Sequence, residues 1–149
     1  MQTDYTRRGW LAAVGSTGVF SRVVAAPPDR PMQGAFMILS TPYTLSQAVD
    51  YEDLAGEVDF LDRCGVQGLV WPQNASEQSK LTKEERMRGM EVLAKAARGR
   101  KPTLVLGVQG AVTEEMLEYA RHAEKLGPDA GIAIPPTKAK SLEIGRAHV

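Results

Sequence analysis

Four short apolar runs alternate along the chain with three longer segments in which apolar residues recur at helical spacing. Short apolar runs of this kind are typical of strands that are buried on both faces, as in a parallel sheet. The predicted strands are Gly34–Ser40, Gly68–Trp71, Pro102–Gly107 and Ala130–Ile134. Successive strands begin roughly thirty residues apart, the length of one strand–helix unit. The pattern therefore predicts a parallel α/β architecture, and its spacing fits a closed barrel and an open doubly wound sheet equally.

Helix boundaries follow from the residues that cap helix ends. The expected helices are Tyr51–Cys64, Lys83–Arg98 and a third that Thr113 caps and Gly127 ends. Asp50 precedes the first helix as its N-cap, and Gly65 follows its last residue. The expected buried stripes are Leu54, Val58 and Leu61 in the first helix, Met87, Met90, Ala94 and Ala97 in the second, and Leu117, Ala120 and Ala123 in the third.

The polar loop after the second strand is the strongest candidate for a binding site. It leads into a helix that opens with a capping box, because Thr82 is followed three residues later by Glu85. In a barrel of strand–helix units, the loop after each strand lies on the active-site face. We therefore expect Gln73–Glu77 to lie beside Thr41, after the first strand, and Gln109, after the third.

The same region resembles a known family. The family has a Gly-Thr-Thr-Gly-Glu-Ser segment followed by the start of a helix. Six residues of this chain align with that pattern without a gap: Glu77, Leu81, Thr82, Glu84, Glu85 and Arg86. The residues at the Gly-Thr-Thr-Gly positions depart from the motif and are Gln73, Asn74, Ala75 and Ser76. This pattern resembles the dihydrodipicolinate synthase and N-acetylneuraminate lyase family, and the resemblance extends over Gly34–Pro136. It implies an α/β fold of the (β/α)8 TIM-barrel type, with residues 34–142 as a truncated half barrel of four parallel strands and three helices.

The resemblance also implies a chemistry. Members of the family are class I aldolases and lyases that form a Schiff base between a lysine and pyruvate or a related 2-oxo acid. The family's lysine lies on a later strand, so no catalytic residue, no cofactor and no metal is expected within this chain, which alone should be inactive. The expected substrate-binding residues are Thr41, Asn74, Ala75 and Ser76. Asn74 is expected to face the barrel axis, and the Ser76 hydroxyl to compensate for the missing side-chain donor at Ala75.

Three interpretations stay open at this point. The complete protein could be a divergent, exported family member that acts on a 2-oxo acid or a sugar-acid-like compound and forms a homo-oligomer. It could instead have lost catalysis and bind a carboxylate ligand or a partner. It could also be an unrelated parallel α/β binding domain. A lysine on the sixth strand of the continuation would separate the first from the second, and four further strand–helix units in the continuation would exclude the third.

The N-terminal segment has the order of features expected of an export signal. Arg7 and Arg8 resemble the twin-arginine motif, and a modestly apolar stretch and small residues follow them. We therefore expect residues 1–26 to be a signal peptide read by the export machinery, residues 27–33 to be a linker, and the protein to be periplasmic or extracytoplasmic. The alternative is an unprocessed N-terminal helix with solvated arginines.

The last seven residues, EIGRAHV at 143–149, have an unusual property. They can be back-translated as GAG ATC GGA AGA GCA CAC GTC, which from its second base matches a widely used sequencing-library adapter. We therefore expect this stretch to be an artefact and the natural protein to continue differently. A half barrel would leave strand edges unpaired, so the isolated chain is expected to be marginally stable or prone to aggregation.

Composition narrows the remaining possibilities. The 149 residues are 43% apolar and 24% charged, which is ordinary for a soluble globular protein. A formal net charge of +0 gives no electrostatic reason to expect a nucleic-acid partner. Cys64 is the only cysteine, so no intrachain disulfide can form, and we expect it to be a small buried residue. His122 has no partner at ligand spacing and is interpreted as a surface or boundary residue.

Overall fold

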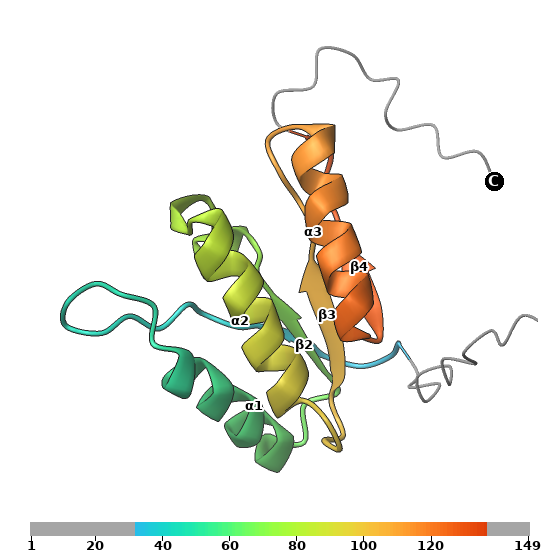
Figure 1. The fold of residues 1–149 in the computed structure, drawn as a ribbon. Coiled ribbons are helices and arrows are strands. Elements are labelled where there is room, and N and C mark those ends of the chain that lie inside the picture. The colour runs from blue at the N-terminus through green and yellow to red at the C-terminus, as the bar shows by residue number, and fades with distance from the viewer. Residues whose placement is uncertain (1–31, 137–149) are drawn as a thin grey trace, which may run out of the picture.

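The computed structural model describes residues 32–136, in which strands and helices alternate along the whole length (Figure 1). The elements are β1 (Phe36–Ile38), α1 (Tyr51–Cys64), β2 (Gly68–Trp71), α2 (Lys83–Ala96), β3 (Thr103–Gly107), α3 (Thr113–Leu126) and β4 (Ala130–Ile132). Two short 3-10 turns, η2 (Asn74–Ser76) and η3 (Gln78–Lys80), occupy the loop after β2. The predicted alternation is confirmed. The predicted signal peptide at 1–26 and the predicted artefact at 143–149 lie outside the described residues.

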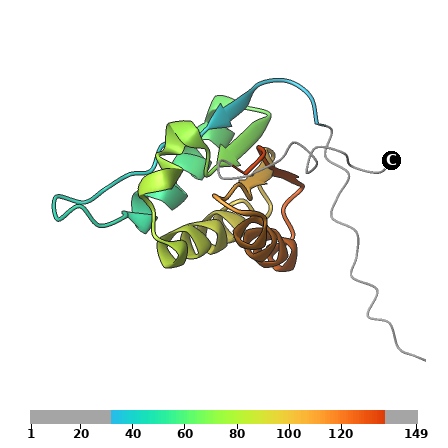
Figure 2. The same cartoon turned by 90° about the horizontal axis from the view of Figure 1, so that it is seen from above.

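The four strands form one parallel sheet in the order β1-β2-β3-β4. The register pairs Met37 with Leu69, Leu69 with Leu104, and Leu106 with Gly131. Strands that follow each other in sequence are therefore neighbours in space, as in the winding of a barrel. All three helices cover the same face of the curved sheet (Figure 2). The strands β1 and β4 are shorter than their apolar runs, because each pairs on one side only within the described part of the chain.

The core lies between the sheet and the helices. Its largest contributors are Leu69, Trp71, Leu104 and Leu106 from the strands and Leu54, Val58, Met90, Leu93 and Tyr119 from the helices. On the opposite face, Val70 and Val105 of the central strands are buried, whereas Ile38 and Ile132 of the outer strands are 47% and 38% exposed. The predicted stripes of the first two helices are confirmed, since each of these residues is buried or packs against the core.

Two predictions about the third helix are wrong. Leu117 is 47% exposed, and Tyr119 is the buried residue, at 2%. Residues two apart on a helix point about 200° away from each other, so burying Tyr119 turns Leu117 outward. Thr113 is the first helical residue and not the cap; Val112 takes that position without a side-chain bond. The Glu115 carboxylate instead accepts from the Ala111 N–H at 2.7 Å, which stabilises the helix start.

Cys64 and His122 differ in how well the sequence predicted their surroundings. Cys64 is exposed, contrary to prediction, because it lies in the last turn of α1, beyond the residues that this helix buries. His122 is half-buried, and its Nε2 lies 3.3 Å from the Met87 carbonyl oxygen and 3.4 Å from the Glu91 carboxylate. The interpretation of His122 as a boundary residue is confirmed.

Candidate functional site

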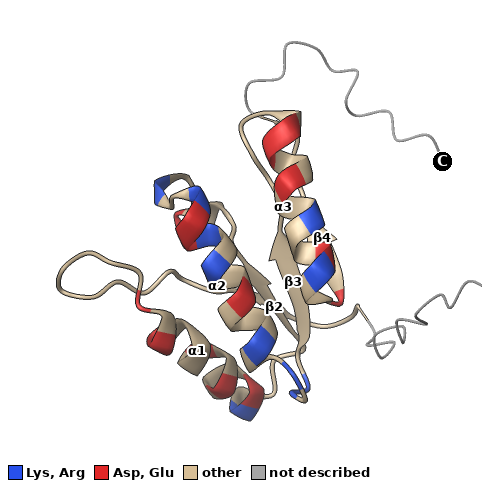
Figure 3. Ribbon diagram, in the orientation of Figure 1, with Lys and Arg blue, Asp and Glu red and all other residues tan. Residues whose placement is uncertain are grey.

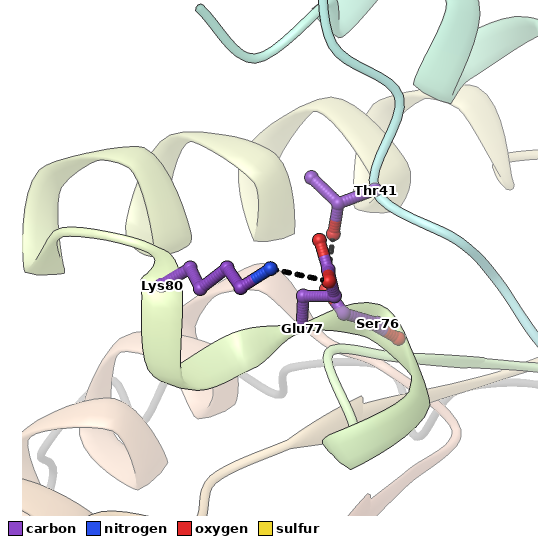
Figure 4. Close-up of polar contacts among 4 residues, drawn as sticks. All are labelled: Thr41, Ser76, Glu77 and Lys80. Atoms are coloured by element: carbon purple, nitrogen blue, oxygen red, sulfur yellow. Dashed lines mark hydrogen bonds and ion pairs between the residues drawn. The ribbon is translucent and has the colours of Figure 1, made fainter. Parts of the chain in front are cut away.

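The carboxyl ends of β1, β2 and β3 meet at one rim of the sheet. The Thr41 hydroxyl, after β1, donates to the Ser76 carbonyl oxygen at 2.5 Å. The Gln109 amide, after β3, donates to the Pro72 carbonyl oxygen at 2.9 Å. The expectation that Thr41, Gln109 and the loop after β2 lie side by side is therefore confirmed. Figure 4 shows Thr41 directed at this loop.

Ser76 is held inside the loop. Its side chain is fully buried, at 0% exposure. The hydroxyl donates to the Leu39 carbonyl oxygen at 2.5 Å and accepts from the Gln73 N–H at 3.1 Å. A serine hydroxyl has a single proton to donate. That proton points at the main chain of the first strand segment and not at the surface of the loop, where Ala75 lacks a side-chain donor.

Asn74 and Ala75 are the two exposed residues between Gln73 and Ser76. The Asn74 amide was expected to face the barrel axis, but its Oδ1 accepts from Gln78 Nε2 at 2.7 Å, so the side chain folds back over η3. The main-chain N–H groups of Asn74 and Ala75 begin the 3-10 turn and donate no hydrogen bond to any described residue. Free N–H groups at the start of a turn favour a negatively charged ligand group.

Lys80 and Glu77 lie on the outside of the same loop. Their exposed side chains form an ion pair of 2.6 Å (Figure 4). The hydrogen bond to Glu77 raises the pKa of Lys80. A bond to Glu118 in the same way raises the pKa of Lys83. A Schiff-base lysine needs a lowered pKa to act as a nucleophile near neutral pH, so neither side chain suits that role.

A cavity of about 350 Å³ opens beside the loop. Asn74 and Gln109 line it from the loops, and Arg86, Glu115 and Tyr119 line it from α2 and α3. The Oε1 of Gln109 and the Nε of Arg86 are buried and have no hydrogen-bond partner among the described residues. Gln78, which also lines the cavity, has a buried Oε1 without a partner among the described residues, so the lining residues carry one unpaired donor and two unpaired acceptors.

Arg86 is the residue of this region to which sequence reasoning gave no role. It is 4% exposed, its Nη2 donates to the Gly107 carbonyl oxygen at 3.2 Å, and its guanidinium lies 3.9 Å from the centre of the Tyr119 ring. Burial lowers the pKa of Arg86, and Tyr119 and Glu115 oppose that shift. Burial also raises the pKa of Tyr119. The only signal in the sequence was that Arg86 falls in register with the family motif.

Charge is confined to the helices and loops. The helices α2 and α3 carry both acidic and basic residues, α1 is acidic except for Arg63 in its last turn, and the four strands carry no charged residue (Figure 3). Among residues 32–136, no cluster of three or more His, Cys, Asp or Glu side chains is arranged to hold a metal ion. None of the helices in this same range has the length and apolarity that a membrane span requires.

Comparison with known proteins gives a consistent result. The sequence pattern of the Dihydrodipicolinate synthetase family matches residues 31–144. The 4-hydroxy-tetrahydrodipicolinate synthase of Phenylobacterium zucineum (strain HLK1) is 37% identical over 108 residues, which are 72% of this chain and 36% of that protein. This chain therefore spans little more than a third of that relative's length.

Two solved structures extend the comparison to the fold. Dihydrodipicolinate synthase from Aquifex aeolicus matches with a TM-score of 0.66 and 29% identity, over 70% of this chain and 35% of its own. YagE, a prophage protein of the dihydrodipicolinic acid synthase family from E. coli K12, in complex with pyruvate, matches with a TM-score of 0.70 and 27% identity, over 76% and 38%. Both are TIM barrels, so the fold prediction is confirmed and the described residues form a partial barrel.

Proposed function

Because the chain belongs to the Dihydrodipicolinate synthetase family, we propose that the complete protein is a lyase or aldolase that holds pyruvate or a related 2-oxo acid as a Schiff base. Residues 32–136 contribute the part of the site that binds the substrate carboxylate. The observation that carries this assignment is the pair of free N–H groups of Asn74 and Ala75 at the carboxyl end of β2. The pyruvate in the structure of the E. coli relative supports a 2-oxo acid as the ligand.

The Schiff-base lysine of this proposal lies outside residues 32–136. Lys80 and Lys83 form ion pairs that raise their pKa values. Lys95, Lys101 and Lys125 lie in helices or in the loop before β3 and not after the carboxyl end of a strand. The described segment therefore contributes substrate binding, and the covalent step belongs to the remainder of the barrel.

Export and assembly are part of the same proposal. Arg7 and Arg8 and the apolar stretch after them support export by the twin-arginine route, to the periplasm or another extracytoplasmic space. The complete protein acts there as a homo-oligomer. The loop departs from the family motif at Gln73, Asn74 and Ala75, and this difference is consistent with a different substrate, available outside the cytoplasm.

Loss of catalysis is the second candidate function. Ala75 offers no side-chain donor, and the hydroxyls of Thr41 and Ser76 both donate to the main chain. A loop of this kind can still bind a carboxylate through its N–H groups. The second candidate differs from the first only in lacking the covalent step.

Borohydride trapping distinguishes the two candidates. The complete protein, incubated with pyruvate and sodium borohydride, is expected to gain the mass of one reduced pyruvate per subunit, because borohydride reduces the iminium to a stable amine. Lactate, which has no carbonyl group, is the matched control and should give no adduct. If pyruvate binds in a calorimeter but no adduct forms, the protein is a binding protein and the proposed lyase activity is refuted.

The Asn74 amide should make a modest contribution to carboxylate binding. Asn74 is exposed, its Oδ1 accepts from Gln78 Nε2, and its Nδ2 is the atom that can donate to a ligand. Asn74→Ala is expected to weaken pyruvate binding by about 1 kcal/mol, roughly fivefold. Isothermal titration of the complete protein measures this, with Ser46→Ala, an exposed position in the loop after β1 that does not line the cavity, as the control. Equal affinities of the two variants would remove Asn74 from the site.

A further inference from the structure

We propose that Trp71, Thr41 and Ser76 form a hydrogen-bonded clamp that fixes the carboxylate-binding loop, so that they are positioning residues and not substrate ligands. The expected effect of the clamp on catalysis rests on the proposed function. The clamp itself rests on four hydrogen bonds that join the end of β1, the end of β2 and the loop.

Two of these bonds cross between Ser76 and the segment after β1. Thr41 Oγ1 donates to the Ser76 carbonyl oxygen at 2.5 Å, and Ser76 Oγ donates to the Leu39 carbonyl oxygen at 2.5 Å. Each hydroxyl gives its only proton to a main-chain acceptor. Both side chains are buried, at 8% and 0% exposure, so water does not compete for these bonds. Ser76 is therefore tied to the first strand segment through its carbonyl and through its side chain.

The third bond fixes the start of the loop. The Gln73 N–H donates to Ser76 Oγ at 3.1 Å, which closes the loop onto itself across Asn74 and Ala75. The two exposed residues are thus held between two anchored ones. A ligand that binds their N–H groups meets a loop that is already ordered, and it loses less conformational entropy on binding.

Trp71 connects this clamp to the helix layer. Its Nε1–H donates to Thr41 Oγ1 at 3.1 Å, which orients that hydroxyl toward Ser76. The indole is fully buried, and its ring fills the space at Gly89 of α2, where any Cβ atom would overlap Cη2 of Trp71. The position of α2 therefore fixes Trp71, Trp71 orients Thr41, and Thr41 holds the loop.

Side-chain substitutions separate a clamp from a ligand. In the complete protein, Trp71→Phe removes the indole donor and keeps most of the ring volume, and Thr41→Val removes the hydroxyl at similar shape. Both variants are expected to raise KM for pyruvate about three- to tenfold, the effect of one hydrogen bond, with a smaller change in kcat. Hydrogen exchange of the amides of residues 73–77 should become faster in both. Thr41→Ser, which keeps the hydroxyl, should restore both quantities toward the wild-type values.

The measured KM and the exchange rates of the loop amides each support or overturn the clamp. Folded Trp71→Phe and Thr41→Val variants with unchanged KM and unchanged loop exchange would overturn the clamp, and so would a Thr41→Ser variant as impaired as Thr41→Val. If wild-type protein forms no adduct with pyruvate, the proposed function fails, but the exchange of the loop amides still tests the clamp. Faster exchange in Thr41→Val and normal exchange in Thr41→Ser would then support it without reference to activity.

Discussion

Replacing Gly107 with alanine is expected to destabilise the protein by about 3 kcal/mol, at the upper end of the range for overpacking a core. A Cβ at Gly107 would overlap the Pro72 carbonyl oxygen and lie 2.9 Å from Gln109 Oε1. The obstructing atom belongs to the main chain, so no side-chain rotation can make room. Pro72 could retreat only by moving away from Gln109 Nε2, which donates to its carbonyl at 2.9 Å.

Chemical denaturation by urea, with the midpoints compared, measures this effect. The matched control is Gly131→Ala in β4, because a Cβ there meets only the Leu106 carbonyl oxygen at 3.8 Å, an ordinary contact. The control should unfold within about 0.5 kcal/mol of wild type, as most unstrained substitutions do. Equal midpoints for the two variants would show that the ends of β2 and β3 can separate freely, contrary to the contacts at this rim.

Features of the fold that depend on neighbouring residues were predictable from the sequence. The capping box of α2 is an example: Thr82 Oγ1 accepts from the Glu85 N–H at 3.1 Å, and Glu85 accepts from the Thr82 N–H at 2.9 Å. Both partners lie within one helical turn, so spacing alone identifies them. The same holds for Asp50, which accepts from the N–H groups of Glu52 and Asp53 at 3.1 Å.

Features that depend on distant residues were not predictable. The phase of α3 is set by Tyr119, which packs under the Arg86 guanidinium of α2, and no local pattern shows that contact. Periodicity assigned the buried position to Leu117 instead. The bonds of Ser76 depend on Leu39, which lies 37 residues earlier in the chain. A single sequence shows the hydroxyl but not the carbonyl that it meets, so Ser76 was interpreted as a ligand donor.

Arg86 is the second position at which a large effect is expected. Arg86→Ala should lower the free energy of unfolding by about 3 kcal/mol, because it leaves a cavity and deprives the buried Gly107 carbonyl of its donor. Arg86→Met fills most of that cavity and removes a charge whose burial is itself unfavourable, as the lowered pKa of Arg86 indicates. The methionine variant should therefore lose only about 1 kcal/mol, the value of the missing hydrogen bond.

The two large effects should be coupled, because Arg86 and Gly107 act on the same strand end. Arg86 Nη2 holds the Gly107 carbonyl, and the Gly107 Cα lies against the Pro72 carbonyl. The Gly107→Ala substitution displaces this strand end and thereby weakens the hydrogen bond from Arg86 Nη2 to the carbonyl oxygen of residue 107. The Gly107→Ala/Arg86→Ala double variant should then be less destabilised than the sum of the single variants, by at least about 0.5 kcal/mol. Strict additivity in urea unfolding would mean that Arg86 stabilises α2 and α3 alone, without a part in positioning the end of β3.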